Sequence, residues 1–91
     1  MRAIRMKHGV VFLKIDGVSI KIKANGEVGL SPILFDNVEW DLRTEPPSEW
    51  EYITESDVRG MGEGVYEAVL AEADSYNKLL GCKSADEKRQ K

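Results

Sequence analysis

Apolar and polar residues alternate through residues 10–23 (VVFLKIDGVSIKIK), a period of two that predicts a β-hairpin. The turn is Asp16-Gly17, because both central residues of a type I′ turn need a positive φ. Pairing outward from this turn gives one apolar face, made of Val11, Leu13, Ile15, Val18, Ile20 and Ile22. The other face is cationic and only partly apolar, and carries Val10, Phe12, Lys14, Ser19, Lys21 and Lys23. The hairpin therefore has one side suited to a core and one suited to solvent.

The same period appears in residues 2–7 (RAIRMK), which predicts a first strand. His8-Gly9 supplies the next turn. If these two residues form the whole loop, Met6 faces Val11 and the first strand joins the apolar side of the hairpin. That register adds two residues to the predicted core face, Ile4 and Met6.

Two further strands are predicted after the turn at residues 24–27. Residues 28–35 form the fourth, with an irregular entry, and Pro32 favours an edge position or a strand start. Residues 38–43 (VEWDLR) alternate cleanly and predict a fifth, with Val38, Trp40 and Leu42 on one face. The prolines at residues 46 and 47 end this strand, because proline lacks the N–H that a sheet needs.

Beyond the prolines the period changes to steps of three and four residues, which is typical of one face of a helix. The apolar residues in this pattern are Val58, Met61, Val65, Ala68, Val69, Tyr76, Leu79 and Leu80. A capping box at residues 54–57 and a glycine at position 81 predict a helix over about residues 56–80. Glycines at positions 60, 62 and 64 weaken its first turns. Either the regular helix begins nearer Glu63, or the glycines let it lie close on the sheet.

These elements predict an α+β fold, an antiparallel β-meander of four or five strands packed against one long C-terminal α-helix. A chain of 91 residues forms one small domain with one thin core. We assign residues 1–81 to this domain and residues 82–91 to a disordered charged tail, because the tail lacks apolar periodicity.

The charge, hydropathy and cysteine content of the chain disfavour several classes of protein. A net charge of -3 disfavours a general nucleic-acid-binding role. The longest uncharged apolar run is residues 10–13, which predicts no transmembrane helix, and the N-terminal residues lack the apolar core of a secretory signal. We therefore expect a cytoplasmic protein with no membrane partner. Its single cysteine cannot form an internal disulfide, and with one histidine there is no zinc-ligand set.

Charge is distributed unevenly along the chain. Residues 1–26 hold six Lys/Arg against one acid, residues 27–76 hold thirteen Asp/Glu against two Arg, and residues 77–91 hold five basic against two acidic residues. In one interpretation the basic strands and the acidic middle pair within the fold. In the other they are two separate binding surfaces.

No segment carries a catalytic or cofactor motif. The glycines of GMGEG (residues 60–64) lack the Gly-Lys-Ser/Thr ending of a phosphate loop, do not match G-x-G-x-x-G, and lie among acids that repel phosphate. His8 and Cys82 have no partner at a motif spacing. The acids of residues 36–51 suit a glycosidase pair or a Mg²⁺ site only within a deep cleft, which a small sheet does not offer. We expect a non-catalytic protein without cofactor or metal.

The acidic segment around the prolines contains tryptophans, which are enriched at binding hot spots. The candidate residues for binding a cationic protein surface are Glu39, Asp41, Glu49, Trp50 and Glu51. The competing interpretation places Trp40 in the core and Trp50 at the end of the sheet.

The basic sheet face is the alternative site. Cations spaced around an aromatic ring are typical of single-stranded nucleic-acid platforms, where phosphate contacts and base stacking combine. The residues of this alternative are Arg5, Phe12, Lys14, Lys21 and Lys23. A solvated sheet face protected by lysines from edge pairing explains the same residues.

The segments VVFLKIDGVSIKIK and ILFDNVEWDLRTEPPSEWEYI, followed by a long amphipathic helix, resemble the small immunity proteins of bacterial polymorphic toxin systems, in the family numbered 74. The likeness covers roughly residues 10–73, and the GMGEG stretch departs from it. The resemblance implies an immunity or antitoxin-type inhibitor that binds a cognate toxin.

The order of elements is also similar to the transcriptional-coactivator-like fold of four strands and a helix. That likeness implies a dimeric single-stranded nucleic-acid-binding protein. A phage or mobile-element accessory protein with a structural role is a third interpretation, and a homodimer is compatible with each.

Overall fold

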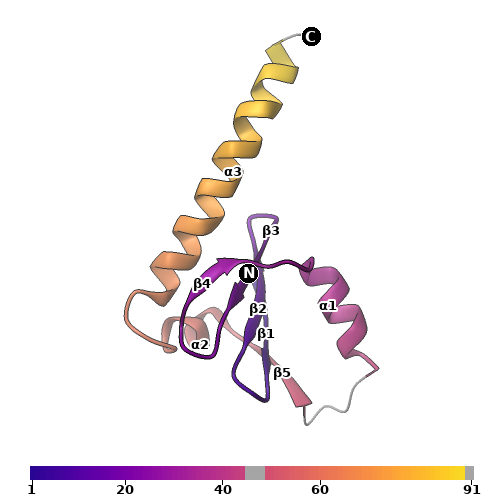
Figure 1. The fold of residues 1–91 in the computed structure, drawn as a ribbon, viewed down its shortest axis with the longest axis vertical. Helices are drawn as coiled ribbons and strands as arrows, with labels where there is room; N and C mark the ends of the chain where they lie inside the picture. The colour runs from indigo at the N-terminus through magenta and orange to yellow at the C-terminus, as the bar shows by residue number, and fades with distance from the viewer. Residues whose placement is uncertain (45–48, 90–91) are drawn as a thin grey trace.

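The computed structural model describes residues 1–44 and 49–89, with side chains to Leu79. Its centre is a five-stranded antiparallel sheet in the order β4-β3-β2-β1-β5 (Figure 1). The strands are β1 (Arg2–Met6), β2 (Val11–Ile15), β3 (Val18–Ile22), β4 (Val28–Leu30) and β5 (Trp50–Ile53). The helices are α1 (Phe35–Leu42), α2 (Glu55–Arg59) and α3 (Val65–Arg89). The α+β fold with a long C-terminal helix on the sheet is confirmed.

The central hairpin has the register that its turn predicts. Asp16 and Gly17 both have a positive φ, at 51° and 79°, as a type I′ turn requires. Leu13 lies opposite Ile20, and Ile15 lies opposite Val18. The apolar side of the hairpin packs against α3 in one core cluster, with Ala3, Val11, Leu13, Ile15, Val18, Ile20, Ile22, Ile53, Val58, Val65, Tyr66, Val69 and Ala73 buried.

The predicted register of the first strand is wrong by one residue. The loop between β1 and β2 has three residues, closed by hydrogen bonds from Met6 N to Val10 O (2.7 Å) and from Gly9 N to Met6 O (2.9 Å). Gly9 takes a φ of 99°, as the last residue of such a loop often does. Ile4 therefore lies opposite Phe12 instead of Leu13. Since side chains alternate along a strand, this shift moves Ile4 and Met6 to the opposite face of the sheet.

The strand predicted over residues 38–43 is a helix, and residues 32–34 are a loop instead of part of the fourth strand. Phe35, Val38 and Leu42 recur at steps of three and four residues, so a helix places all three on one side. They pack on the second face of the sheet around Ile4, with Met6, Phe12 and Trp50 partly buried beside them. The helix is favourable here because its apolar side covers Ile4 and part of Phe12 on this face.

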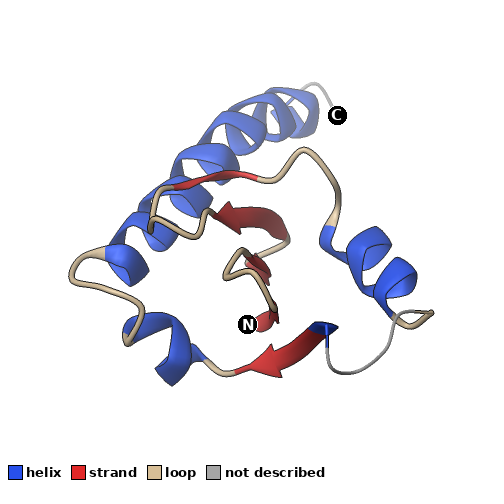
Figure 2. Cartoon of the chain, turned by 60° about the horizontal axis from the view of Figure 1, so that its bottom comes forward, coloured by secondary structure: helices blue, strands red, loops and turns tan. Residues whose placement is uncertain are grey.

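The sheet is consequently covered on both faces, by α1 on one side and by α2 and α3 on the other (Figure 2). The added strand β5 pairs with β1 and forms one edge, while β4 forms the other. The predicted solvated cationic face is therefore wrong in part, because α1 packs on it.

The predicted single helix is divided in two. The capping box is confirmed: the Thr54 side chain accepts from Asp57 N, and the Asp57 carboxylate accepts from Thr54 N. The glycine-rich stretch 60–64 then breaks the helix, and Gly64 takes a φ of 80°. The regular helix α3 begins at Val65, close to the later of the two predicted starts.

Helix α3 continues to Arg89, so Gly81 does not end it. The side chains of Leu80 and Cys82 lie outside the described part, and the disordered tail at residues 82–91 stays a prediction. Among the helices that the structure describes, none is long and apolar enough to cross a membrane.

Candidate functional site

Glu39, the first of the predicted partner-binding residues, is buried at 6% exposure between α1 and the sheet. Its carboxylate accepts hydrogen bonds from the Arg2 guanidinium and, at 2.7 Å, from the Tyr52 hydroxyl. The bond to Glu39 raises the pKa of Tyr52 above its usual 10.0, because it stabilises the protonated phenol. Glu39 thus joins α1 to β1 and β5 and has little surface to offer a partner.

Trp50 and Glu51 point to opposite faces of the sheet, as neighbours in a strand must. Trp50 is half-buried and packs edge-on to Tyr52, with ring centroids 5.2 Å apart. Glu51 lies beside β1 and accepts from Arg5 at 2.8 Å. The predicted acidic site is therefore divided, and Trp50 is not a free anchor.

Asp41 and Glu49 remain exposed, as the predicted binding role requires. Asp41 lies on α1, and Glu49 immediately precedes β5, where its carbonyl accepts from Lys7 N at 2.9 Å. Within the described residues neither carboxylate forms an ion pair. The prolines at 46 and 47, predicted to end the strand over residues 38–43, lie outside the described residues.

The residues of the alternative nucleic-acid surface do not all share one face. Arg5 lies opposite Val11 on the α3 side, so its predicted place beside Phe12 is wrong. Phe12 is partly buried by α1, and Lys14 pairs with Asp36 of that helix at 3.3 Å. Lys21 lies with its Nζ 5.9 Å from the Phe12 ring centroid. Phe12 is therefore only partly available for stacking with a base.

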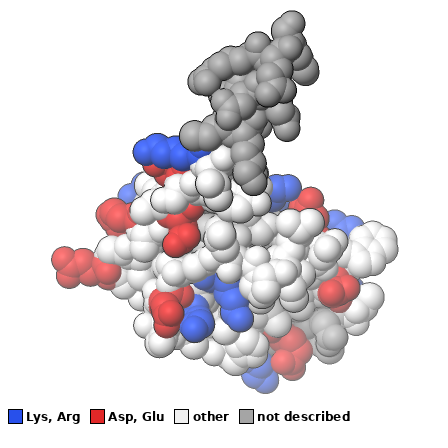
Figure 3. Space-filling model, turned by 45° about the horizontal axis from the view of Figure 1, so that its top comes forward, with Lys and Arg blue, Asp and Glu red and all other residues white. Residues whose placement is uncertain are grey.

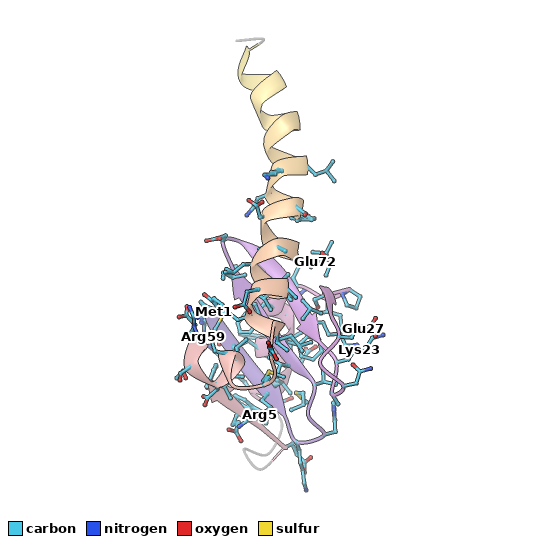
Figure 4. All side chains as sticks on the ribbon, turned by 90° about the vertical axis from the view of Figure 1, so that its left-hand side faces the viewer. Met1, Arg5, Lys23, Glu27, Arg59 and Glu72 are labelled. Atoms are coloured by element: carbon cyan, nitrogen blue, oxygen red, sulfur yellow. The ribbon has the colours of Figure 1, made fainter. Side chains whose placement is uncertain are left out.

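Lys23, the last residue of the alternative set, lies just beyond β3 and pairs with Glu27 at 3.7 Å (Figure 4). It lines a shallow surface hollow of about 210 Å³ together with Lys21, Glu27, Val28, Gly29 and Leu30. This hollow is open and mixed in charge, and it presents no aromatic ring for a base.

Basic residues of the N-terminal strands pair with acids of the following segment. Four such pairs are Arg2–Glu39, Arg5–Glu51, Lys14–Asp36 and Lys23–Glu27. Figure 3 shows acidic and basic side chains interspersed over the face in view. The interpretation in which the two charge blocks pair within the fold is supported by these contacts.

The outer side of α1 carries an exposed surface, which the prediction of a strand over residues 38–43 does not identify. Trp40 is 70% exposed there, whereas the strand pattern places it in the core. Helical spacing puts Asp36 and Asn37 on the same side of α1 as Trp40, and Asp41 is the next residue along the chain. We call these four residues the α1 surface. The signal that finds it is the helical spacing of Phe35, Val38 and Leu42, which leaves Trp40 on the far side.

Helix α2 is joined to α3 by a cluster of three side chains. Glu55 accepts from the Tyr66 hydroxyl at 2.8 Å and from Arg59 Nε at 3.3 Å, and the Arg59 guanidinium stacks 4.0 Å from the Tyr66 ring centroid. The hydrogen bond from Tyr66, followed by that from Arg59, lowers the pKa of Glu55. This cluster stabilises the link between the helices across the glycine-rich break.

We expect the stability of the domain to fall in acid because of this link. The pKa of Glu55 lies below its ordinary 4.5, and the hydrogen bond from Thr54 N lowers that of Asp57 below its ordinary 3.8. Since the unfolded chain takes up these protons first, the stabilisation is present above about pH 5 and is lost as the pH falls through the lowered values. Denaturant midpoints measured from pH 7 to pH 3 test this expectation. Glu55→Gln should flatten the decline, and a decline as steep as that of the unmodified chain would contradict the assignment.

Within the described residues, no group of three or more His, Cys, Asp or Glu is arranged to hold a metal ion. Compared with known proteins, the chain matches no family model, no curated protein and no solved structure. The resemblance to immunity proteins stays a prediction.

Proposed function

We propose that this protein is a non-catalytic protein-binding module that docks on a cationic surface of another protein through the α1 surface. The observation that carries the proposal is the 70% exposure of Trp40 on a helix whose other side is buried. An exposed tryptophan on a rigid helix loses little conformational freedom on binding and buries a large area.

The charges around this anchor define the partner. Residues 36–51 contain six acids against one arginine. Asp41, on the α1 surface, and Glu49, before β5, form no ion pair among the described residues. Exposed carboxylates in the segment that carries the aromatic anchor favour a basic partner, because complementary charge speeds association and disfavours wrong partners. In its sharpest form the module is an immunity or antitoxin-type inhibitor that covers a cationic site of a toxin.

The anchor differs from the one that the sequence pattern predicts. Trp50 is half-buried and Glu39 is internal, so Trp40 takes the place of Trp50 as the anchor, whereas Asp36 is already paired with Lys14. Asp41 and Glu49 keep the role that the sequence predicts for them.

The test is affinity capture from host lysate with matched variants. The chain should retain one stoichiometric basic protein at a low 260/280 nm ratio. Trp40→Ala should weaken that complex by about 30-fold, because truncation of a hot-spot tryptophan costs about 2 kcal/mol or more. Asp41→Lys with Glu49→Lys should abolish it.

The matched control is Leu70→Ala, an exposed residue on α3, which should bind as the unmodified chain does. Retention of the partner by Trp40→Ala, or the absence of any retained protein, would count against the proposal. A high 260/280 nm ratio that collapses after nuclease treatment would instead support the nucleic-acid interpretation and direct attention to Lys21 and Lys23.

A further inference from the structure

An exposed apolar patch lies where α3 passes the end of the sheet. Its members are Leu30, Ile33, Leu34, Tyr76 and Leu79, with exposures of 47%, 47%, 66%, 36% and 61%. Leu30, Leu34 and Tyr76 also line a hollow of about 110 Å³ beside the start of β3. Leu30, Leu34 and Tyr76, which share this hollow, form an exposed apolar surface of the kind that marks an interaction site.

Helix α3 extends beyond the sheet at this patch (Figure 1). Val65, Val69 and Ala73 are buried against the sheet, and Asn77 Nδ2 donates to Asp16 O at 3.1 Å at its end. The next described residues, Lys78 and Leu79, are exposed, although the helix continues to Arg89. Residues 78–89 extend α3 by about 18 Å beyond Asn77. Lys78 and Leu79 therefore lie where a partner can cover them.

The charge pattern of α3 is complementary to that of a second, antiparallel copy. Residues 63–77 carry four acids (Glu63, Glu67, Glu72 and Asp74) and no Lys or Arg, whereas residues 78–91 carry five basic and two acidic residues. Two such helices attract each other when antiparallel and repel when parallel. An antiparallel pair is also what a two-fold axis produces.

The patch is self-complementary about such an axis. It contains both a hollow, beside Tyr76, and an apolar projection, Leu79, one turn further along the same helix. If Leu79 of each copy lies opposite Tyr76 of the other, residue 72 of one lies opposite residue 83 of the other. These residues are Glu72, which lies on α3 near the end of the sheet (Figure 4), and Lys83.

We propose that the protein forms a homodimer through antiparallel packing of α3 against α3, with Leu79 of each copy seated against the hollow of the other. Trp40 lies on the outer side of α1 and is not a member of the patch, so the dimer presents two copies of Trp40 to its partners. The proposal goes beyond the proposed function and does not depend on it.

The first test is the solution mass, measured by sedimentation over a concentration series. The expected species has twice the 10.2 kDa mass of the chain. Leu79→Glu should raise the dimer Kd more than about 100-fold, because the two-fold axis buries the new charge twice. Leu70→Glu, on another side of α3, and Trp40→Ala should leave the mass unchanged. A monomer at every concentration, or a dimer that survives Leu79→Glu, would overturn the proposal.

A charge exchange tests the register. Glu72→Lys alone should weaken the dimer by roughly tenfold, and so should Lys83→Glu, since each places like charges opposite each other in two places. The double variant Glu72→Lys with Lys83→Glu should restore the original Kd, and high salt should remove the difference. Failure of the double variant to restore dimerisation would overturn the antiparallel register. Circular dichroism of each variant verifies that the fold is retained.

Discussion

Phe35→Ala should destabilise the domain by about 3–5 kcal/mol, the usual effect of truncating a buried phenylalanine. Phe35 is 1% exposed and is the largest side chain by which α1 packs on the second face of the sheet. A domain of this size is stable by only about 5–15 kcal/mol, so the variant should lose much of its stability. Urea denaturation measured by circular dichroism determines the change.

The matched variant is Trp40→Ala on the same helix. Because Trp40 is 70% exposed, we expect its removal to change the stability by less than about 0.5 kcal/mol. The two variants distinguish a helix from the strand that the alternation of residues 38–43 predicts. If Trp40→Ala were more destabilising than Phe35→Ala, Trp40 would be buried, and this result would contradict the assignment of residues 35–42 to a helix.

Arg2→Ala should cost about 1.5–3 kcal/mol, because it leaves the buried Glu39 carboxylate without its charged donor. The Glu39 side chain is only 8% exposed, and the Tyr52 hydroxyl alone remains to bond it. A buried carboxylate that loses its partner cannot recover the lost interaction from water.

Arg5→Ala is the control, since Arg5 also lies on β1 and also binds a carboxylate. Its partner Glu51 is 62% exposed and becomes hydrated when the arginine is removed, so we expect a cost below about 1 kcal/mol. The pair Arg2→Met with Glu39→Leu should return the stability toward that of the unmodified chain. Equal losses for Arg2→Ala and Arg5→Ala would contradict the burial of Glu39.

Much of the candidate surface was not accessible from the sequence pattern. The sequence pattern identifies Asp41 and Glu49 because they are charged and lie in an acidic segment, but it places Trp40 in the core. A strand over residues 38–43 and a helix over Phe35–Leu42 both gather apolar residues on one side, and they differ in where they place Trp40. The helix is favoured over the strand because Phe35, Val38 and Leu42 then bury Ile4 and part of Phe12 on the second face of the sheet.

The central hairpin and the presence of a helix that packs on it follow from local sequence patterns alone. The Asp-Gly turn sets its own backbone angles, and the period of the residues around it sets the apolar face, so both follow from local geometry. The capping box at Thr54 and Asp57 is local in the same way.

Other features of the fold depend on contacts between residues that are far apart in the sequence. The local pattern does not select the three-residue loop before β2, and this loop places Ile4 on the face of the sheet where it packs with Phe35. Residues 35–42 become a helix because that face requires a cover, and β5 forms because β1 offers it an open edge. Local patterns specify turns and faces, whereas the partner of each face is set by long-range burial, which no single segment encodes.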